Sequence, residues 1–520
     1  MFSSVFVFNV TTFLCTLPII ILVILWRYII KTYRRDPRLV QFAETIPGPP
    51  EVSIFGSSAD LLHGEDSLNK LIKYTEKYGH MYKLWFGRYL VVGLSKAEDI
   101  NAVFMSSKTN GKPDLFFNSF HDYWGDGLFT SKGSIWKNNR KKLTPPFAGS
   151  RFKHYAIHIN DKTKNVLKVL EKHVNGPEFD IKDYTPYLSF DIITKILFNV
   201  ELSWDNQMVK TFHHSTMKAI IASYERMCLP WFHMKFLNYF YYGKEIKEIY
   251  DSTRALTKKI WKEKTSQINN EVRLHKENPD KLPVEEIPPK LFLTEAFELL
   301  NDGYDETVVH DEMMTAISGG TDTTATVLAF LILSIALHQN VQAKLYDEIY
   351  EVFGDNDRYA DQEDIKRLSY LDQVVKESMR RFTLVPFILK DVSEDAKIGG
   401  RVFPAGTVIL IPIAAVHFDP KYYPNPWQFN PENFSSEAVE NRPKHTFIPF
   451  SAGARNCIGQ NLALYEMKLI TIALLRKYSI HTTMKMKDIK INSSFTISSA
   501  NGYNISIKYR IKKPSYLLNN

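Results

Sequence analysis

The chain begins with a nearly continuous run of apolar residues from Val5 to Trp26. A helix of about this length can cross a bilayer. No basic residue precedes the run, whereas Arg27, Lys31 and three further arginines follow it, so the positive-inside rule places the body of the protein in the cytosol. We therefore expect an uncleaved transmembrane anchor over residues 1–27. The alternative is a cleaved secretory signal, which normally has a basic start and a shorter apolar run.

A basic, proline-rich linker is expected over residues 28–50, and it ends in the stiff sequence Pro47-Gly-Pro-Pro50. Residues 51–520 are long enough to bury a large core, in two lobes or one large domain. Short alternating runs between residues 51 and 103 predict a small sheet there. The runs at 495–498 and 504–508 predict a hairpin near the end of the chain.

Helical periodicity is strongest in two long segments. One runs from about Val308 to Leu337 and contains Gly319-Gly320, although each glycine inside a helix costs about 1 kcal/mol relative to alanine. Either a flat group passes close to this backbone, or the helix bends. The second segment follows Gly459. Together these patterns predict a mainly α fold with a small β portion.

Composition narrows the function classes only a little. Hydrophobic residues make up 44% and charged residues 23% of the chain, as in a globular protein. The net charge of +8 suggests an anionic membrane surface or an acidic partner more than nucleic acid, because no nucleic-acid motif accompanies it. Three cysteines argue against a disulfide framework and for a reducing compartment.

Cys457 lies in the segment Phe450-Ser-Ala-Gly453-Ala-Arg455-Asn-Cys457-Ile-Gly459. The glycines let backbone approach a flat ligand, and the helix that follows favours an anion at its N-terminus. A soft thiolate in such a setting suits iron, above all haem iron. Two alternatives are a buried structural cysteine and a catalytic nucleophile; the second needs a base that no spacing identifies.

Asp322 and Thr323 follow the two glycines on the first long helix. The Thr323 hydroxyl can reach the carbonyl of Gly319, four residues earlier. An acid beside a hydroxyl in apolar surroundings is suited to proton delivery. The alternative is a helix kink without a catalytic role.

Two further pairs have helical spacing. Glu377 and Arg380 are three residues apart in a partly apolar setting, so they form either an ordinary pair or a buried one that is costly to break on one side. Trp136 and Arg140 share one helix face.

These motifs extend over nearly the whole chain. In their order along it, from the anchor to the cysteine segment, they resemble those of the cytochromes P450. The resemblance implies a haem held between two central helices, with Cys457 as the iron ligand and Thr323 and Asp322 in proton delivery. It implies cofactor contacts from Trp136, Arg140, Lys390, Phe450, Gly453, Arg455 and Gly459. Lys390 stands where many relatives have arginine. A structural role is implied for Glu377, Arg380 and Asn433. At the position of Asn433 the family commonly has arginine.

The resemblance also implies a function and partners. We expect a haem-thiolate monooxygenase that inserts one atom of O2 into a fatty acid, hormone, pheromone or xenobiotic. Its cofactor would be haem b, and its partners NADPH–cytochrome P450 reductase, with cytochrome b5 as a further candidate, at the endoplasmic reticulum membrane. A reductase-independent haem-thiolate isomerase or dehydratase, and a non-catalytic haem protein that binds hydrophobic ligands, are the alternatives.

Two local sequences, Trp124-Gly-Asp-Gly-Leu-Phe-Thr-Ser and Glu312-Met-Met-Thr, are similar to the animal fatty-acid ω-hydroxylase-like clan, in an arthropod branch. Many members of that clan have a glutamate that esterifies the haem. Gly319 stands at that position here, so we expect the haem to be non-covalent apart from the bond from Cys457 to iron.

Overall fold

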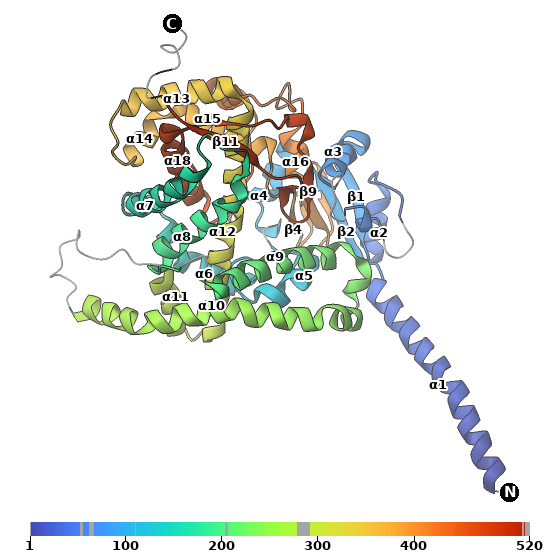
Figure 1. Ribbon diagram of the computed structural model, residues 1–520. Coiled ribbons are helices and arrows are strands. Elements are labelled where there is room, and N and C mark those ends of the chain that lie inside the picture. Colours follow the sequence, from blue (N-terminus) through green and yellow to red (C-terminus); the bar gives the residue numbers. More distant parts are fainter. Residues whose placement is uncertain are drawn as a thin grey trace.

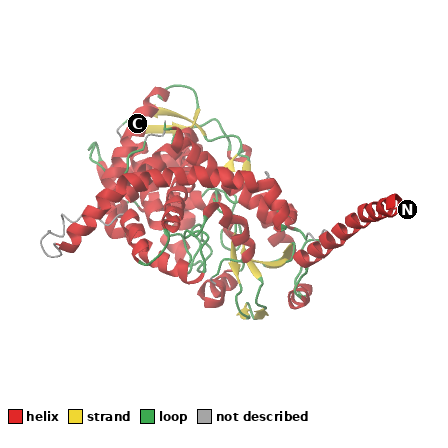
Figure 2. Cartoon of the chain, turned by 90° about the horizontal axis from the view of Figure 1, so that it is seen from below, coloured by secondary structure: helices red, strands yellow, loops and turns green. Residues whose placement is uncertain are grey.

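The computed structural model describes residues 2–51, 56–61, 67–109, 111–202, 206–277, 292–511 and 514. Helices dominate this part of the chain and the strands are short (Figures 1 and 2), which confirms the predicted mainly α fold with a small β portion. The helices are α1 (Phe2–Tyr33), α2 (Pro37–Glu44), α3 (Ser67–Tyr78), α4 (Ala97–Met105), α5 (Asp114–Trp124), α6 (Gly133–Leu143), α7 (Phe152–Leu170), α8 (Thr185–Phe198), α9 (Gln207–Cys228), α10 (Lys235–Glu277), α11 (Phe292–Asn301), α12 (Glu306–Leu337), α13 (Gln339–Phe353), α14 (Gln362–Arg367), α15 (Ser369–Arg381), α16 (Ile413–His417), α17 (Ser436–Glu440) and α18 (Gln460–Lys477). The strands are β1 (Met81–Phe86), β2 (Tyr89–Leu94), β3 (Phe179–Asp180), β4 (Ile388–Asp391), β5 (Ala396–Ile398), β6 (Arg401–Phe403), β7 (Val408–Ile411), β8 (Tyr478–His481), β9 (Ile491–Ser493), β10 (Ile497–Ser499) and β11 (Asn504–Tyr509).

Helix α1 projects away from the body (Figure 1), and its apolar side chains from Leu17 to Trp26 are exposed. The window from Thr16 to Tyr33 is apolar and long enough to be a candidate membrane span. Helix α12 passes the same test, but 78% of it is buried inside the body, so it is a core helix.

The segment predicted as a linker is partly helical. Helix α1 continues to Tyr33, whose hydroxyl donates a hydrogen bond of 2.7 Å to the carbonyl of Pro230. Helix α2 then buries Leu39 and Ala43 in a cluster with strand residues. The second half of residues 28–50 therefore packs on the body.

A four-stranded sheet in the order β1-β2-β7-β4 contains the strands predicted before residue 103. Strands β1 and β2 form an antiparallel hairpin, whereas β7, from late in the chain, pairs parallel to β2. Strand β4 pairs antiparallel to β7 and carries Lys390.

The prediction of a hairpin between residues 495–498 and 504–508 is wrong, because the two strands found there do not pair with each other. Strand β10 pairs with β9, which precedes it, while β11 pairs with β8 and β3. The alternating pattern identified both strands correctly, but alternation fixes which face is buried and does not select the partner strand.

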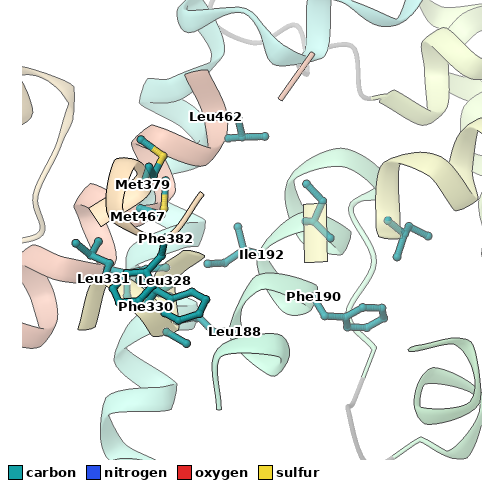
Figure 3. Close-up of a cluster of buried hydrophobic side chains, with 14 of the residues drawn as sticks. Leu188, Phe190, Ile192, Leu328, Phe330, Leu331, Met379, Phe382, Leu462 and Met467 are labelled. Carbon is teal, nitrogen blue, oxygen red and sulfur yellow. The ribbon is translucent and has the colours of Figure 1, made fainter. Parts of the chain in front are cut away.

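Helix α12 passes through the centre of the body and packs against α8, α15 and α18 (Figures 1 and 3). Figure 3 shows side chains of these four helices in one cluster, where Phe330 stacks on Phe382 with ring centroids 4.3 Å apart. A Cβ at Gly320 would lie 2.6 Å from Ile193, so this glycine allows close contact between α12 and α8. At Gly319, no atom lies within 4 Å of the equivalent position.

Candidate functional site

A largely apolar cavity of about 390 Å³ lies between α12 and the loop that precedes α18. Apart from Gly453, every predicted catalytic or cofactor-binding residue lines it: Trp136, Arg140, Asp322, Thr323, Lys390, Phe450, Arg455, Cys457 and Gly459. The predicted structural residues do not line the cavity: Glu377, Arg380 and Asn433. The fold therefore brings together side chains that are more than 300 residues apart in the sequence.

Cys457 faces the cavity just before the N-terminus of α18, for which Gly459 is the N-cap. Its N–H donates a hydrogen bond of 3.0 Å to the carbonyl of Phe450, which closes the loop. Burial raises the pKa of the Cys457 thiol, although the N–H groups of Gly459 and Gln460 and the charge of Arg140 act in the opposite direction. A bound metal ion deprotonates a coordinating thiol, so iron would supply the missing stabilisation of the thiolate.

The glycines of the site leave room that a flat group could occupy. Gly453 has φ +74°, and a Cβ there would lie 3.0 Å from the carbonyl oxygen of Phe104, so the loop needs glycine. Around Gly459 and Gly319 the protein leaves room for a side chain: the nearest atom to a Cβ at Gly459 is 4.0 Å away. Since both line the cavity, a Cβ at either position would take up space that a planar cofactor can use.

Three cations line the same cavity: Lys390, which is buried, and Lys112 and Arg455, which are half-buried. Burial lowers the pKa of Lys112 to about 7 and that of Lys390 to about 8, with repulsion from Arg455 as a second cause for both. Burial and repulsion from Arg140 lower the pKa of Arg455 to about 10. None of the three has a carboxylate within ion-pair distance among the residues that the structure describes. Such a cluster calls for an anionic ligand, and the two propionates of haem match it.

Lys112 was not predicted from the sequence. It is a lone lysine in the segment Gly111-Lys112-Pro113, where no periodicity or spacing signals a ligand. Its ammonium lies over the rings of Phe116 and Phe129, at 4.0 and 5.0 Å from their centroids.

Trp136 and Arg140 lie on α6, as their spacing predicted, but their contacts are mainly with the cysteine loop. The Arg140 guanidinium donates two hydrogen bonds to Asn456, of 2.9 Å to its carbonyl and 2.8 Å to its side-chain oxygen. The Arg455 guanidinium stacks on Trp136 at 4.1 Å and donates to the carbonyl of Ser131 at 2.9 Å. Hydrogen bonds from Trp136 and Arg140 to a propionate stay a prediction.

Thr323 donates its hydroxyl proton to the carbonyl of Gly319, the contact expected from the spacing. The surroundings of Asp322 differ from the expectation, because they are not wholly apolar: the Lys182 ammonium lies 3.5 Å from its carboxylate. Lys182 also hydrogen-bonds the hydroxyl of Thr326, one helical turn further along α12. Burial lowers the pKa of Lys182, and the neighbouring Asp322 carboxylate partly offsets this. Lys182 is a second functional candidate that sequence reasoning missed.

Glu377 and Arg380 form a fully buried ion pair on α15. The guanidinium makes two 2.8 Å hydrogen bonds to the carboxylate and three more to the carbonyls of His417, Pro426 and Gln428. Asn433 adds an amide hydrogen bond of 3.3 Å to each oxygen of Glu377. It thus reaches the pair as a neutral donor.

His417 connects this pair to the cysteine loop. Its Nε2 accepts a hydrogen bond of 3.1 Å from the N–H of Ile448, two residues before Phe450. Burial, aided by the charge of Arg380, holds the pKa of His417 well below its ordinary value, so the ring stays neutral and can accept this bond. The ion pair therefore acts on the loop through a buried histidine.

The cysteine before the N-terminus of α18, the glycines that leave the cavity open and the cluster of cations are features that a haem-thiolate site needs. The sequence pattern of the family "Cytochrome P450" matches residues 46–505, and the chain belongs to the cytochrome P450 family. It is accordingly a haem-iron monooxygenase.

Curated relatives are found in vertebrates and insects. The chain is 30% identical to Cytochrome P450 4V2 of Homo sapiens over 455 residues, which cover 86% of each chain. It is 32% identical to Cytochrome P450 4V2 of Mus musculus, over 85% of each. It is 28% identical to Cytochrome P450 4c21 of Blattella germanica, over 90% of this chain and 94% of the relative. These relatives confirm the resemblance to the ω-hydroxylase-like clan.

Proposed function

We propose that this P450 inserts one atom of O2 into a lipophilic substrate with electrons from NADPH, delivered by NADPH–cytochrome P450 reductase. Fatty acids, hormones, pheromones and xenobiotics are the candidate substrates, and cytochrome b5 is a second candidate donor. The observation that supports the proposal is that one apolar cavity holds the Cys457 thiol, the Asp322–Thr323 pair and the cation cluster.

The cofactor in this proposal is haem b, bound through Cys457 and otherwise non-covalently, since Gly319 offers no carboxylate. Haem bound by a thiolate supplies the activation of dioxygen. Lys112, Lys390 and Arg455 hold its carboxylates. The apolar wall binds the substrate and excludes water from the reaction.

Proton delivery is assigned to α12. Asp322 faces Lys182 on one side and the cavity on the other, so it can accept a proton from the direction of the protein surface. The Thr323 hydroxyl, next in the chain, can pass a proton into the cavity.

The proposed location is the endoplasmic reticulum membrane. Residues 1–27 form the anchor, and the catalytic domain of residues 51–520 lies in the cytosol. In the last turn of α6, Arg140 is bonded to Asn456 and Lys142 is paired with Asp302 at 2.7 Å, so the exposed Lys141 is the cation that this turn offers to an acidic electron donor.

Two measurements on purified full-length holoprotein test this function. The reduced carbonyl complex should show the spectrum of thiolate ligation, and Cys457→Ala should lose it. Incubation with NADPH, reductase and a panel of lipophilic compounds should give oxygenated products that depend on both. Product formation from hydroperoxides without reductase would instead support an isomerase or dehydratase, and a thiolate spectrum without any turnover would support a ligand-binding haem protein.

A further inference from the structure

The loop between α5 and α6, residues 125–131, is held on α12 by two consecutive buried carboxylates. The N–H of Asp126 donates to Asp311 at 2.8 Å, and the N–H of Leu128 donates to Glu312 at 2.9 Å. Asp311 is also paired with Arg254 of α10. A buried carboxylate that accepts backbone N–H groups fixes the backbone strongly, because either side left alone would be an unsatisfied polar group.

Glu312 also joins this loop to the helix on the cofactor side. Its second oxygen accepts a hydrogen bond of 2.8 Å from the side-chain amide of Asn139, on α6, next to Arg140. The far end of the loop is held from another direction, because the carbonyl of Ser131 accepts the bond from Arg455. The loop is thus bonded at Asp126, at Leu128 and at Ser131.

Two glycines make this close approach to α12 sterically possible. A Cβ at Gly125, where φ is +60°, would lie 1.9 Å from the Asp311 carboxylate. A Cβ at Gly127 would lie 2.4 Å from the Thr315 hydroxyl oxygen and 2.8 Å from the Asp311 carbonyl oxygen. Any side chain at either position would lift the loop away from the carboxylates.

The side chains of this loop form part of the cavity wall. Leu128 and Phe129 line the cavity, as does Trp124 at the end of α5. Phe129 contacts the rings of Phe116 and Phe495, at centroid distances of 5.3 and 5.9 Å. A shift of the loop would therefore move several aromatic side chains together.

We propose that Glu312 is a positioning residue for substrate binding: it fixes loop 125–131 on α12 and so sets the aromatic wall of the cavity. This inference rests on the proposed function, since it treats the cavity as the substrate site. Glu312 lines the cavity, but its side chain is fully buried and its two oxygens are bonded to Leu128 and Asn139, so it would act through Leu128 and Phe129.

The test uses two azoles of different size that bind haem iron and shift its absorption spectrum. Imidazole is too small to reach the aromatic wall of the cavity. Clotrimazole carries three phenyl-type rings besides its imidazole and must contact this wall. The substitution Glu312→Gln keeps the size of the side chain but gives Asn139 an amide in place of a carboxylate oxygen. We expect it to weaken clotrimazole binding at least tenfold and to change the Kd of imidazole less than twofold.

Gly127→Ala tests the same inference by moving the loop instead of changing Glu312. If Glu312→Gln does not fold, this second variant tests the positioning role. It should show the same selective loss of clotrimazole binding. Glu348→Gln is the matched control: Glu348 accepts the N–H groups of Tyr370 (2.6 Å) and Leu371 (2.9 Å) at the start of α15, and it does not line the cavity. It should leave both azole affinities unchanged.

An equal change for both azoles, or no change for either in the variants that fold, would overturn the positioning role. A wild-type protein that lacks the thiolate spectrum would refute the proposed function instead. The carbonyl spectrum of each variant therefore separates the two failures.

Discussion

Arg380→Lys should destabilise the protein strongly although it keeps the positive charge. The guanidinium makes five hydrogen bonds, two to Glu377 and three to backbone carbonyls, and it is fully buried. A lysine ammonium has only three donors and lacks the planar fork that matches a carboxylate. At least two of the five bonds, each made by a charged donor, are therefore lost.

The expected magnitude follows from that count. Two lost bonds that involve a charged group cost about 3–6 kcal/mol. For a domain of this size the unfolding entropy is roughly 1 kcal/mol per kelvin, so the melting temperature should fall by about 3–6 °C.

The assay combines thermal unfolding with the carbonyl spectrum of the reduced holoprotein. Since Arg380 supports the carbonyl of His417, and His417 accepts from Ile448 ahead of the cysteine loop, a fraction of the thiolate signal should be lost before global unfolding. The control is Arg381→Lys, one residue further. Arg381 stacks on Phe418 and Trp427, and its Nε has no hydrogen-bond partner in the described chain, so the loss should be about 1 kcal/mol. Equal melting temperatures for the two variants would refute the reasoning.

Three further outcomes are expected. Thr323→Ala should lower the product formed per NADPH several-fold without changing clotrimazole affinity, because it removes the proton-delivering hydroxyl; unchanged coupling would count against that role. Lys390→Met should weaken haem retention several-fold. Between pH 7 and 9 the advantage in haem affinity of the wild-type apoprotein over Lys390→Met should shrink: binding an anion raises the lysine pKa and takes up protons, and Lys390, with a pKa of about 8, loses its charge over this range, whereas the deprotonation of the Cys457 thiol affects both proteins alike. Acidic organic solvent should extract all haem from the wild type, whereas Gly319→Glu should retain a fraction as an ester.

The controls for these experiments are direct. Ser334→Ala, on α12 but away from the cavity, should leave the coupling unchanged. A wild-type advantage over Lys390→Met that stays constant from pH 7 to 9 would contradict the role of Lys390 as a carboxylate ligand. Haem that resists extraction from the wild type would contradict the non-covalent cofactor.

Much of the site could be predicted from local spacing, because the interacting groups lie within one helix or one loop. The bond from Thr323 to Gly319 and the pair Glu377–Arg380 span four and three residues. The position of Cys457 before α18 also follows from an apolar helix that begins just after it. Helical periodicity alone predicted α12 and α18 close to their observed bounds.

Contacts between distant segments could not be predicted in this way. Lys182 lies 140 residues from Asp322, and Leu128 lies 184 residues from Glu312. The pairing of β11 with β3 and β8 was missed for the same reason.

By itself, the sequence determined which segments are helices, where the thiol lies and which charges are spaced to pair, since these depend on neighbours along the chain. Only the tertiary structure decided that Lys112 joins the cation cluster and that two carboxylates of α12 hold the loop before α6. Burial makes those groups important, because charges withdrawn from water need partners, and burial is set by how the helices pack.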